Sequence, residues 1–280
     1  MATLLALFSS LLWGTADYHG GKLSKKYPAI AVLGVTQAIG LVFGVILALF
    51  AGEFSANAFG EKGYFLPGAF AGVFGYLGLI CLYAGLSTGR MGVVAPISAL
   101  SALIPVAYAF FIKGDRLSII LSIGAALAIV GAFLASGPEL SQGLPIKPLI
   151  LALGAAAGFG VALVGMAIGS QGSVLMTMVM MRATTLFISL GILLKYRTIG
   201  GLNFKVAPIL IFIGCADALA NILLGFATTQ GSLTLAMVLG SLYPIFTAVL
   251  AFKFLNERLH HVQYIGIFTA VAGVALISAF

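Results

Sequence analysis

Two ionisable residues lie deep inside long apolar segments of this sequence. Arg182 is nine residues into the segment that starts at Ser173, and Asp217 is eleven residues into the one that starts at Val206. If both segments are helices, a rise of 1.5 Å per residue puts each charge about 14–17 Å from its helix start. A charge at the centre of a membrane costs at least about 2.5 kcal/mol, so each should face a partner or a wet cavity. The two residues therefore predict either a cavity that binds a charged solute or an ion pair that locks two helices together.

Asp17 is a third acidic candidate, late in the first apolar segment and four residues after Trp13. Two interpretations stand. Asp17 is a carboxylate at the mouth of a cavity, or it is a residue at headgroup level beside Lys22. Chains of carboxylates inside a membrane often relay protons. If transport is coupled to protons, Asp217 or Asp17 is therefore predicted to carry the proton.

Uncharged polar and aromatic residues inside the apolar segments complete the candidate cavity lining. Trp13, the single tryptophan, lies about 18 Å into its helix, away from the usual interfacial belt. Asn221 follows Asp217 by four residues and shares its helix face. For each candidate the alternative is a hydrogen bond between helices or a place in the interfacial belt. The full set is Trp13, Gln37, Tyr76, Tyr83, Ser98, Ser101, Asn221, Ser241 and Tyr243.

Three prolines, Pro96, Pro105 and Pro244, also lie inside apolar segments. Proline lacks an amide hydrogen, so each should remove one backbone hydrogen bond and bend its helix. In lipid, the carbonyl groups released in this way are tolerated only where protein or cavity water satisfies them. We therefore expect bends at these residues that shape a cavity or its gates.

The composition places the chain in a membrane. Of its 280 residues, 61% are hydrophobic and 8% are charged, whereas a soluble domain has about 25% charged residues. A spanning helix needs about 20 mainly apolar residues. The predicted fold is an all-α integral membrane protein with ten transmembrane helices, at residues 2–20, 30–51, 64–87, 91–112, 117–136, 148–168, 173–195, 206–228, 232–253 and 261–280.

Glycine spacing adds two expectations. Gly169–Ser173 and Thr228–Ser232 should separate neighbouring spans, because the apolar stretches there are too long for one span and Gly and Ser favour turns. Small-xxx-small spacing predicts close helix contacts, because small residues let helix backbones approach in lipid. Four pairs show it: Gly40–Gly44, Gly68–Gly72, Gly154–Gly158 and Gly165–Gly169.

The chain consists of two related halves, predicted as residues 1–140 and 141–280. The block Gly89–Leu117 recurs in a relaxed form at Thr228–Leu259. Internal repeats of this kind decide how the whole fold is interpreted. The alignment that joins these blocks pairs Pro105 with Pro244, and earlier in the halves Trp13-Gly14 pairs with Phe159-Gly160.

Five spans in each half make the second half enter the membrane from the opposite side. The halves are therefore predicted to be inverted relative to each other, an architecture in which secondary transporters place the substrate site near the midplane between the repeats. Rocking the halves about that site would give alternating access.

The loop charges predict an orientation. The net charge of +7 comes from basic residues in short loops, which is a topology signal and not a nucleic-acid surface. The basic residues fall ten on one side and three on the other, and the richer side should be cytoplasmic, which puts both termini outside. The richer side holds Lys22, Lys25, Lys26, Arg90, Lys147, Lys195, Arg197, Lys205, Lys253 and Arg258, and the other holds Lys62, Lys113 and Arg116.

The repeated block resembles the EamA domain of the drug/metabolite transporter superfamily. The resemblance rests on GRMGVVAPISALSALIPV followed by GDRL, and on LGSLYPIFTAVLAF followed by NERL. It covers the chain as two five-helix copies and implies a central cavity lined by helices 1, 3, 4, 6, 8 and 9. That favours Trp13, Tyr76, Ser98, Asp217, Asn221 and Ser241 as lining, and disfavours Arg182 on helix 7. Members of this type usually have both termini in the cytoplasm, opposite to the charge count, so the orientation stays open.

The function expected from the residues and the resemblance together is secondary active transport of small metabolites across the cytoplasmic membrane. Export of amino acids or related amphipathic compounds is favoured, with Asp217 attracting an ammonium group and Arg182 a carboxylate. The alternatives are an importer or facilitator of a sugar or other neutral solute, and a structural membrane subunit. No enzyme is expected, because H-E-x-x-H and a P-loop are both absent from the sequence.

The expected partners follow from that function. They are a small-molecule substrate, membrane lipid and, where transport is coupled, protons, but not nucleic acid. No catalytic residue, cofactor or metal site is predicted. The protein is expected to be a monomer or a homodimer.

Overall fold

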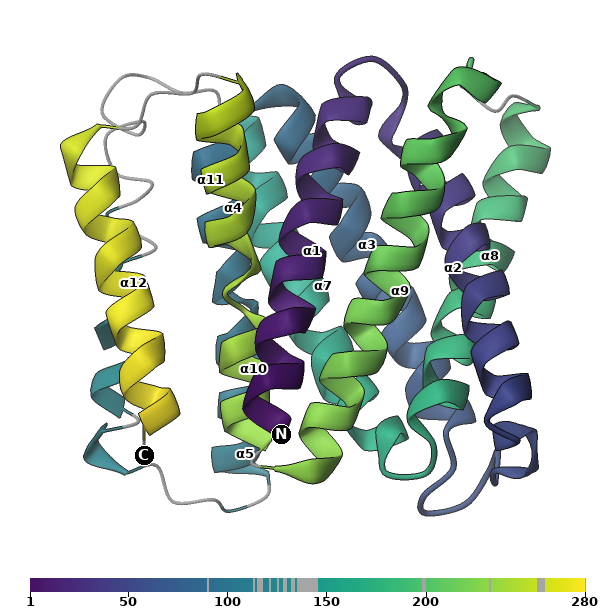
Figure 1. The fold of residues 1–280 in the computed structure, drawn as a ribbon, viewed down its shortest axis with the longest axis horizontal. Coiled ribbons are helices and arrows are strands. Elements are labelled where there is room, and N and C mark those ends of the chain that lie inside the picture. Colours follow the sequence, from purple (N-terminus) through teal and green to yellow (C-terminus); the bar gives the residue numbers. More distant parts are fainter. Residues whose placement is uncertain are drawn as a thin grey trace.

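The computed structural model describes residues 1–89, 91–112, 114, 118–120, 122–124, 126–127, 130–131, 134, 146–197, 200–231, 233–255 and 260–279. Every regular element in these residues is a helix, and the long helices stand side by side in a bundle (Figure 1). The longest are α1 (Ala2–Ser24), α2 (Ala29–Phe50), α3 (Phe65–Thr88), α7 (Ile146–Ser170), α8 (Val174–Tyr196), α9 (Ala207–Gln230) and α12 (His261–Ala279). The shorter ones are α4 (Met91–Ser98), α5 (Leu103–Phe111), α10 (Leu233–Gly240), α11 (Tyr243–Leu255) and the 3-10 turns η1 (Glu53–Ser55), η2 (Ala99–Ala102) and η3 (Phe204–Val206).

Six helical stretches in the described residues are long and apolar enough to cross a membrane. They are Ala29–Phe50, Phe65–Thr88, Val94–Phe111, Ile146–Ser170, Val174–Tyr196 and Phe204–Gln230. Both ends of the chain lie at the same end of the bundle in Figure 1. The count of ten spans remains a prediction, and the loop motifs at 115–117 and 256–259, with Arg90 and Lys113, lie outside the described residues.

The two glycine-rich breaks are confirmed. α7 ends at Ser170 and α8 begins at Val174, and the Met176 amide donates to the Ser173 hydroxyl oxygen at 3.0 Å. Serine is a preferred residue at this capping position because its side chain satisfies an amide that the first helical turn leaves unpaired. α9 ends at Gln230, and α10 begins at Leu233.

The first helix is longer than predicted, running to Ser24 and not to residue 20. Glycine allows this extension because it lets the helix lie directly against α3. Gly20 faces the ring of Tyr83, and a Cβ added at Gly21 would meet Leu86 at 2.9 Å. Asp17 is therefore seven residues before the helix end, a distance of about 10 Å along the axis.

The helix is interrupted near the repeat-related prolines of both halves. In the first half, α4 passes into the 3-10 turn Ala99–Ala102 before α5 begins, and Pro105 cannot donate to the carbonyl of Ser101. In the second half, Ser241 and Leu242 separate α10 from α11, which begins just before Pro244. The gap between α10 and α11 is visible in Figure 1. Pro96 lies inside α4, which continues to Ser98 before the 3-10 turn begins.

Close glycine contacts join the helices where the small-residue spacing predicts them. A Cβ at Gly72 of α3 would lie 2.7 Å from the Met181 carbonyl oxygen of α8. A Cβ at Gly158 of α7 would lie 2.8 Å from the Gly78 amide of α3. Only glycine permits backbones this close, so these positions set the helix spacing around the centre of the bundle.

Helix contacts between the halves occur in matching pairs. α1 packs against α9, and its counterpart α7 packs against α3. α2 packs against α9, and its counterpart α8 packs against α3, while α2 and α8 pack against each other. Likewise α1 contacts the interrupted helix α11 and α7 contacts the interrupted helix α5. If each helix of one half is replaced by its counterpart in the other half, these helix pairs are unchanged. Two related sequences with glycines at corresponding positions are expected to pack in this way.

Candidate functional site

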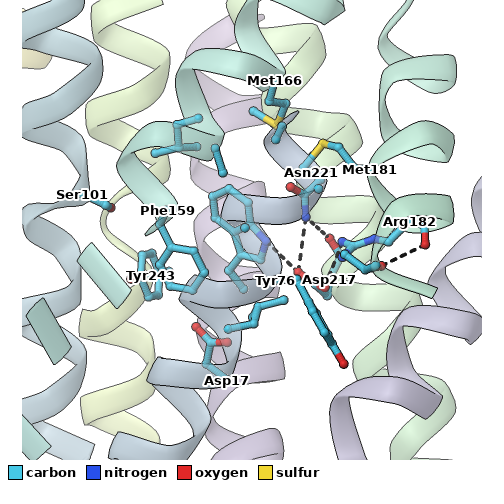
Figure 2. A pocket seen from close by; sticks show the side chains of 18 of the residues that line it. Asp17, Tyr76, Ser101, Phe159, Met166, Met181, Arg182, Asp217, Asn221 and Tyr243 are labelled. Carbon is cyan, nitrogen blue, oxygen red and sulfur yellow. Dashed lines mark hydrogen bonds and ion pairs between the residues drawn. The ribbon is translucent and has the colours of Figure 1, made fainter. Parts of the chain in front are cut away.

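A cavity lies among helices that come from both halves of the chain (Figure 2). Its walls come from α1, α3 and η2 of the first half, and from α7, α8, α9, the start of α11 and the segment between α10 and α11 of the second. Its volume is about 680 Å³ with the open part included. Ser101 and Ser241, which both lie at the helix interruptions, line it.

Asp217 is the centre of a buried polar network at this cavity. Its Oδ1 accepts from the Trp13 indole at 3.0 Å and from the Asn221 amide at 3.3 Å. Its Oδ2 accepts from the Gln37 amide at 3.1 Å and lies 2.9 Å from Nη2 of Arg182. The dashed lines of Figure 2 show several of these contacts meeting at Asp217. A buried carboxylate with this many donors is held in one orientation.

Arg182 is held from two further directions. Its Nη1 donates to the Gln37 side-chain oxygen, which also accepts from the Thr185 hydroxyl at 3.3 Å. Its Nε lies beside Gly40 of α2 and has no hydrogen-bond partner among the described residues. The Arg182 residue is 3% exposed and Asp217 is 8% exposed. The ion pair thus links α8 to α9, and both of its residues also form part of the cavity wall. The sequence had offered a helix-locking pair and a cavity lining as alternatives.

Asp17 lies on the cavity wall without such a network. It is 6% exposed and accepts no hydrogen bond that the structure records from the described residues. In Figure 2 its carboxyl group is drawn at the cavity with no dashed line reaching it. The place of Asp17 inside the protein, with its side chain against a cavity, does not match a carboxylate in the headgroup layer.

The rest of the wall is apolar and aromatic. The rings of Trp13 and Tyr243 meet edge to face, with centroids 6.1 Å apart. Phe159, Met166 and Met181, labelled in Figure 2, line the cavity as well. Aromatic and thioether side chains adapt to flat apolar groups, so this wall suits the apolar part of an amphipathic molecule.

The structure brings most of the sequence candidates together. Nine of them line the cavity: Trp13, Asp17, Tyr76, Ser101, Arg182, Asp217, Asn221, Ser241 and Tyr243. Arg182 does so although the resemblance disfavoured helix 7, because its long side chain reaches from α8 to Asp217 on α9. Ser98, Gln37 and Tyr83 are buried behind the wall, and none of the three prolines lines it. Ser98 shares a hydrogen bond with Tyr243, and Tyr76 shares one with Ser189.

Several lining residues were not found from the sequence. Thr185 is three residues after Arg182, and the shared helix face could have identified it. Phe159, Met166 and Met181 carried no such signal, because an apolar residue that faces a cavity looks the same in sequence as one that faces lipid. Phe159 does pair with Trp13 in the repeat alignment, and both residues line the cavity.

Comparison with known proteins identifies the family. The model of the EamA-like transporter family matches residues 1–137 and again residues 146–279. The chain belongs to this family. It is therefore an integral membrane protein, and members of the family are transporters of small solutes and not enzymes.

Two further proteins are similar to this chain, one in sequence and one in fold. An uncharacterised protein of Methanocaldococcus jannaschii is 32% identical over 87 residues, which are 31% of this chain and 64% of that protein. The alignment thus spans less than two thirds of the relative. A solved crystal structure superposes with a TM-score of 0.74 at 18% identity, covering 99% of this chain and 96% of that one. At this identity the likeness shows the fold alone.

Proposed function

We propose that this EamA-like protein is a secondary active transporter that moves small metabolites across the cytoplasmic membrane by alternating access. The observation that carries the proposal is the cavity built by both halves, with charged residues on its wall and an interrupted helix from each half at its edge. A cavity shared in this way changes shape when one half moves against the other. Interrupted helices facing a central site are a common device of such transporters.

The proposed architecture is ten spans in two inverted five-helix repeats. The matched contacts of α1 with α9 and of α7 with α3 support it, as do the interruptions beside Pro105 and Pro244. Two family matches, one in each half, support it as well. In this architecture the contacts that close one side of the cavity have counterparts that close the other.

The proposed substrates are amino acids or related amphipathic compounds, and the proposed direction is export. A wall that combines Asp17 and the Arg182–Asp217 pair with aromatic and thioether side chains suits a molecule with a charged end and an apolar end. A sugar would need many hydrogen-bonding groups, whereas the wall is mostly apolar. This composition favours the amphipathic class over a neutral polar solute.

The first experiment compares metabolites in the cytosol and medium of cells that express the wild type, Asp217→Ala or Arg182→Ala at matched protein levels. Glu53→Gln is the control, because Glu53 lies in η1 and does not line the cavity. A compound that moves to the medium with the wild type and the control, but not with the two cavity variants, supports the proposal and gives the substrate.

The second experiment uses the purified protein in liposomes loaded with that compound. A transporter should give counterflow that saturates with substrate concentration. Uptake that never saturates would indicate a channel instead. The absence of any flux, together with unchanged metabolites in cells, would contradict the proposal and favour a structural subunit.

A further inference from the structure

We infer that Asp17 is the group that binds the cationic end of the substrate, and that it exchanges that cation for a proton. The cavity should then prefer amines with an aromatic or apolar group over zwitterions and anions of the same shape. This inference rests on the proposed transport function, because it narrows the substrate class of the same cavity.

The first step in the argument is the charge balance of the wall. The charged residues among the described lining are Asp17, Arg182 and Asp217. Arg182 and Asp217 neutralise each other at 2.9 Å. Asp17 therefore supplies the one charge that remains uncompensated among these residues, and it is negative. A cationic group that enters the cavity can pair with the negative charge of Asp17. A carboxylate group finds no unpaired cation among these lining residues.

The second step is that the Arg182–Asp217 network is closed to a substrate. Both oxygens of Asp217 already accept from side chains, including Trp13 at 3.0 Å and Gln37 at 3.1 Å. Both Nε and Nη2 of Arg182 are fully enclosed, and Nε lies beside Gly40 of α2. A substrate carboxylate would have to break the buried ion pair to reach the guanidinium, and separating such a pair costs several kcal/mol.

The third step concerns the surroundings of Asp17. α1 is packed against α2, α3, α9, α10 and α11. From these helices, Asp17 interacts electrostatically with Asp217 of α9, Tyr83 of α3 and Tyr243 of α11. The sequences of α2 and α10 contain no titratable residue. On α1 itself, His19 and Lys22 follow Asp17. The charge of Arg182 is already paired with Asp217, which stands between Arg182 and the Asp17 carboxylate in this set of interactions.

These surroundings require that Asp17 be neutralised in one of two ways. A carboxylate that is 6% exposed and without a donor among the described residues is costly to leave charged. It can hold a proton, or it can lie beside a bound ammonium group. Binding of an amine thus moves the proton from the Asp17 carboxyl oxygen to water while the ammonium group takes its place. Because one site cannot hold both positive charges, the proton and the amine compete, which is the requirement for exchange.

The apolar wall selects the other end of the same molecule. The edge-to-face pair of Trp13 and Tyr243 lines the cavity along with Asp17. Aromatic faces also attract ammonium groups, which adds to the preference for a cation. An aromatic monoamine therefore matches the cavity in both charge and shape.

The test uses three probes with the same phenyl ring: phenethylamine, phenylalanine and 3-phenylpropanoate. Trp13 is the single tryptophan and lies in the cavity wall, so its fluorescence reports binding to the purified protein. Phenethylamine should bind at least about tenfold more tightly than the zwitterion or the anion, because only it completes a desolvated charge pair. Its binding should weaken on acidification and should release up to about one proton per amine bound.

The variants assign the effect to one residue. Asp17→Asn should weaken phenethylamine binding at least about tenfold and remove its pH dependence, whereas Asp17→Glu should keep that pH dependence. Glu53→Gln, outside the cavity, should behave as the wild type. Equal binding of the three probes, no binding of phenethylamine, or pH dependence that survives in Asp17→Asn would overturn the inference.

Counterflow in liposomes separates this inference from the proposed function. If phenethylamine binds as expected but the wild type moves neither it nor any cell metabolite, transport fails and the assignment of Asp17 stands. If another compound shows saturable counterflow and phenethylamine does not bind, the transport function stands and the assignment of Asp17 fails.

Discussion

Ser98 and Tyr243 share a hydrogen bond of 2.7 Å between their hydroxyl groups, and it joins the interrupted helix of one half to that of the other. Ser98 is the last residue of α4, and Tyr243 is the first of α11. The Ser98 hydroxyl also donates to the Ala95 carbonyl at 2.7 Å, so its single hydrogen is used and Tyr243 is the donor between them. Beside it, the Thr247 hydroxyl donates to the Gly14 carbonyl at 3.1 Å. If the halves rock against each other, these links between α1, α4 and α11 must loosen.

The first prediction concerns the energy of this link. Ser98→Ala and Tyr243→Phe should each destabilise the protein, and the double variant should cost about 1 kcal/mol less than the sum of the two. The free energy of unfolding in an SDS titration measures all three. Tyr264→Phe is the control, because Tyr264 is 46% exposed. Strictly additive effects would mean that the two hydroxyls do not depend on each other.

The second prediction concerns the buried ion pair. Asp217→Asn should lower the free energy of unfolding by about 3–5 kcal/mol, since it leaves Arg182 as an uncompensated buried charge. Adding Arg182→Met should recover part of that loss, because the remaining groups are then uncharged. Glu61→Gln, in the exposed loop between α2 and α3, should change stability by less than about 0.5 kcal/mol. A double variant that is less stable than Asp217→Asn would contradict this account of the pair.

The third prediction compares two glycines. Gly158→Ala places a Cβ 2.8 Å from backbone atoms of Phe74 and Gly78, which cannot move aside as a side chain can. It should destabilise the protein by about 1–3 kcal/mol. Gly191→Ala meets no atom within 4 Å and should stabilise by about 0.5–1 kcal/mol through helix propensity. Thermal unfolding in detergent ranks the two variants, and equal melting temperatures would refute the close contact of α3 and α7.

The fourth prediction concerns topology. Gly200 lies against Pro28 and Ala31 at the start of α2, whereas Asn57 follows the end of the same helix. Cysteines at Asn57 and Lys205, both exposed, should therefore react with an impermeant thiol reagent from opposite sides of the membrane. The background replaces Cys81 and Cys215 with alanine. Labelling of both positions from one side would exclude α2 as a spanning helix.

Local sequence signals predicted the helix ends where the deciding contacts are local. The Ser173 cap and the turn after Gln230 depend on residues close in sequence, so glycine and serine were sufficient to find them. The extension of α1 to Ser24 depends on α3, through the contact of Gly20 with Tyr83, and was missed. The helix break near Pro105 was also predicted, because proline removes a backbone hydrogen bond wherever it stands in a helix.

The sequence by itself determined that this is a membrane protein of two related halves, and it predicted which polar residues lie deep inside the apolar helices. These facts follow from composition, helix rise and repeat alignment, which need no knowledge of neighbours. Only the tertiary structure decided that Arg182 pairs with Asp217 while Asp17 stays without a recorded donor among the described residues. The reason is that pairing depends on the rotation of each helix and on close glycine contacts, such as Gly40 beside Arg182. Residues on one helix cannot specify which other helix will face them.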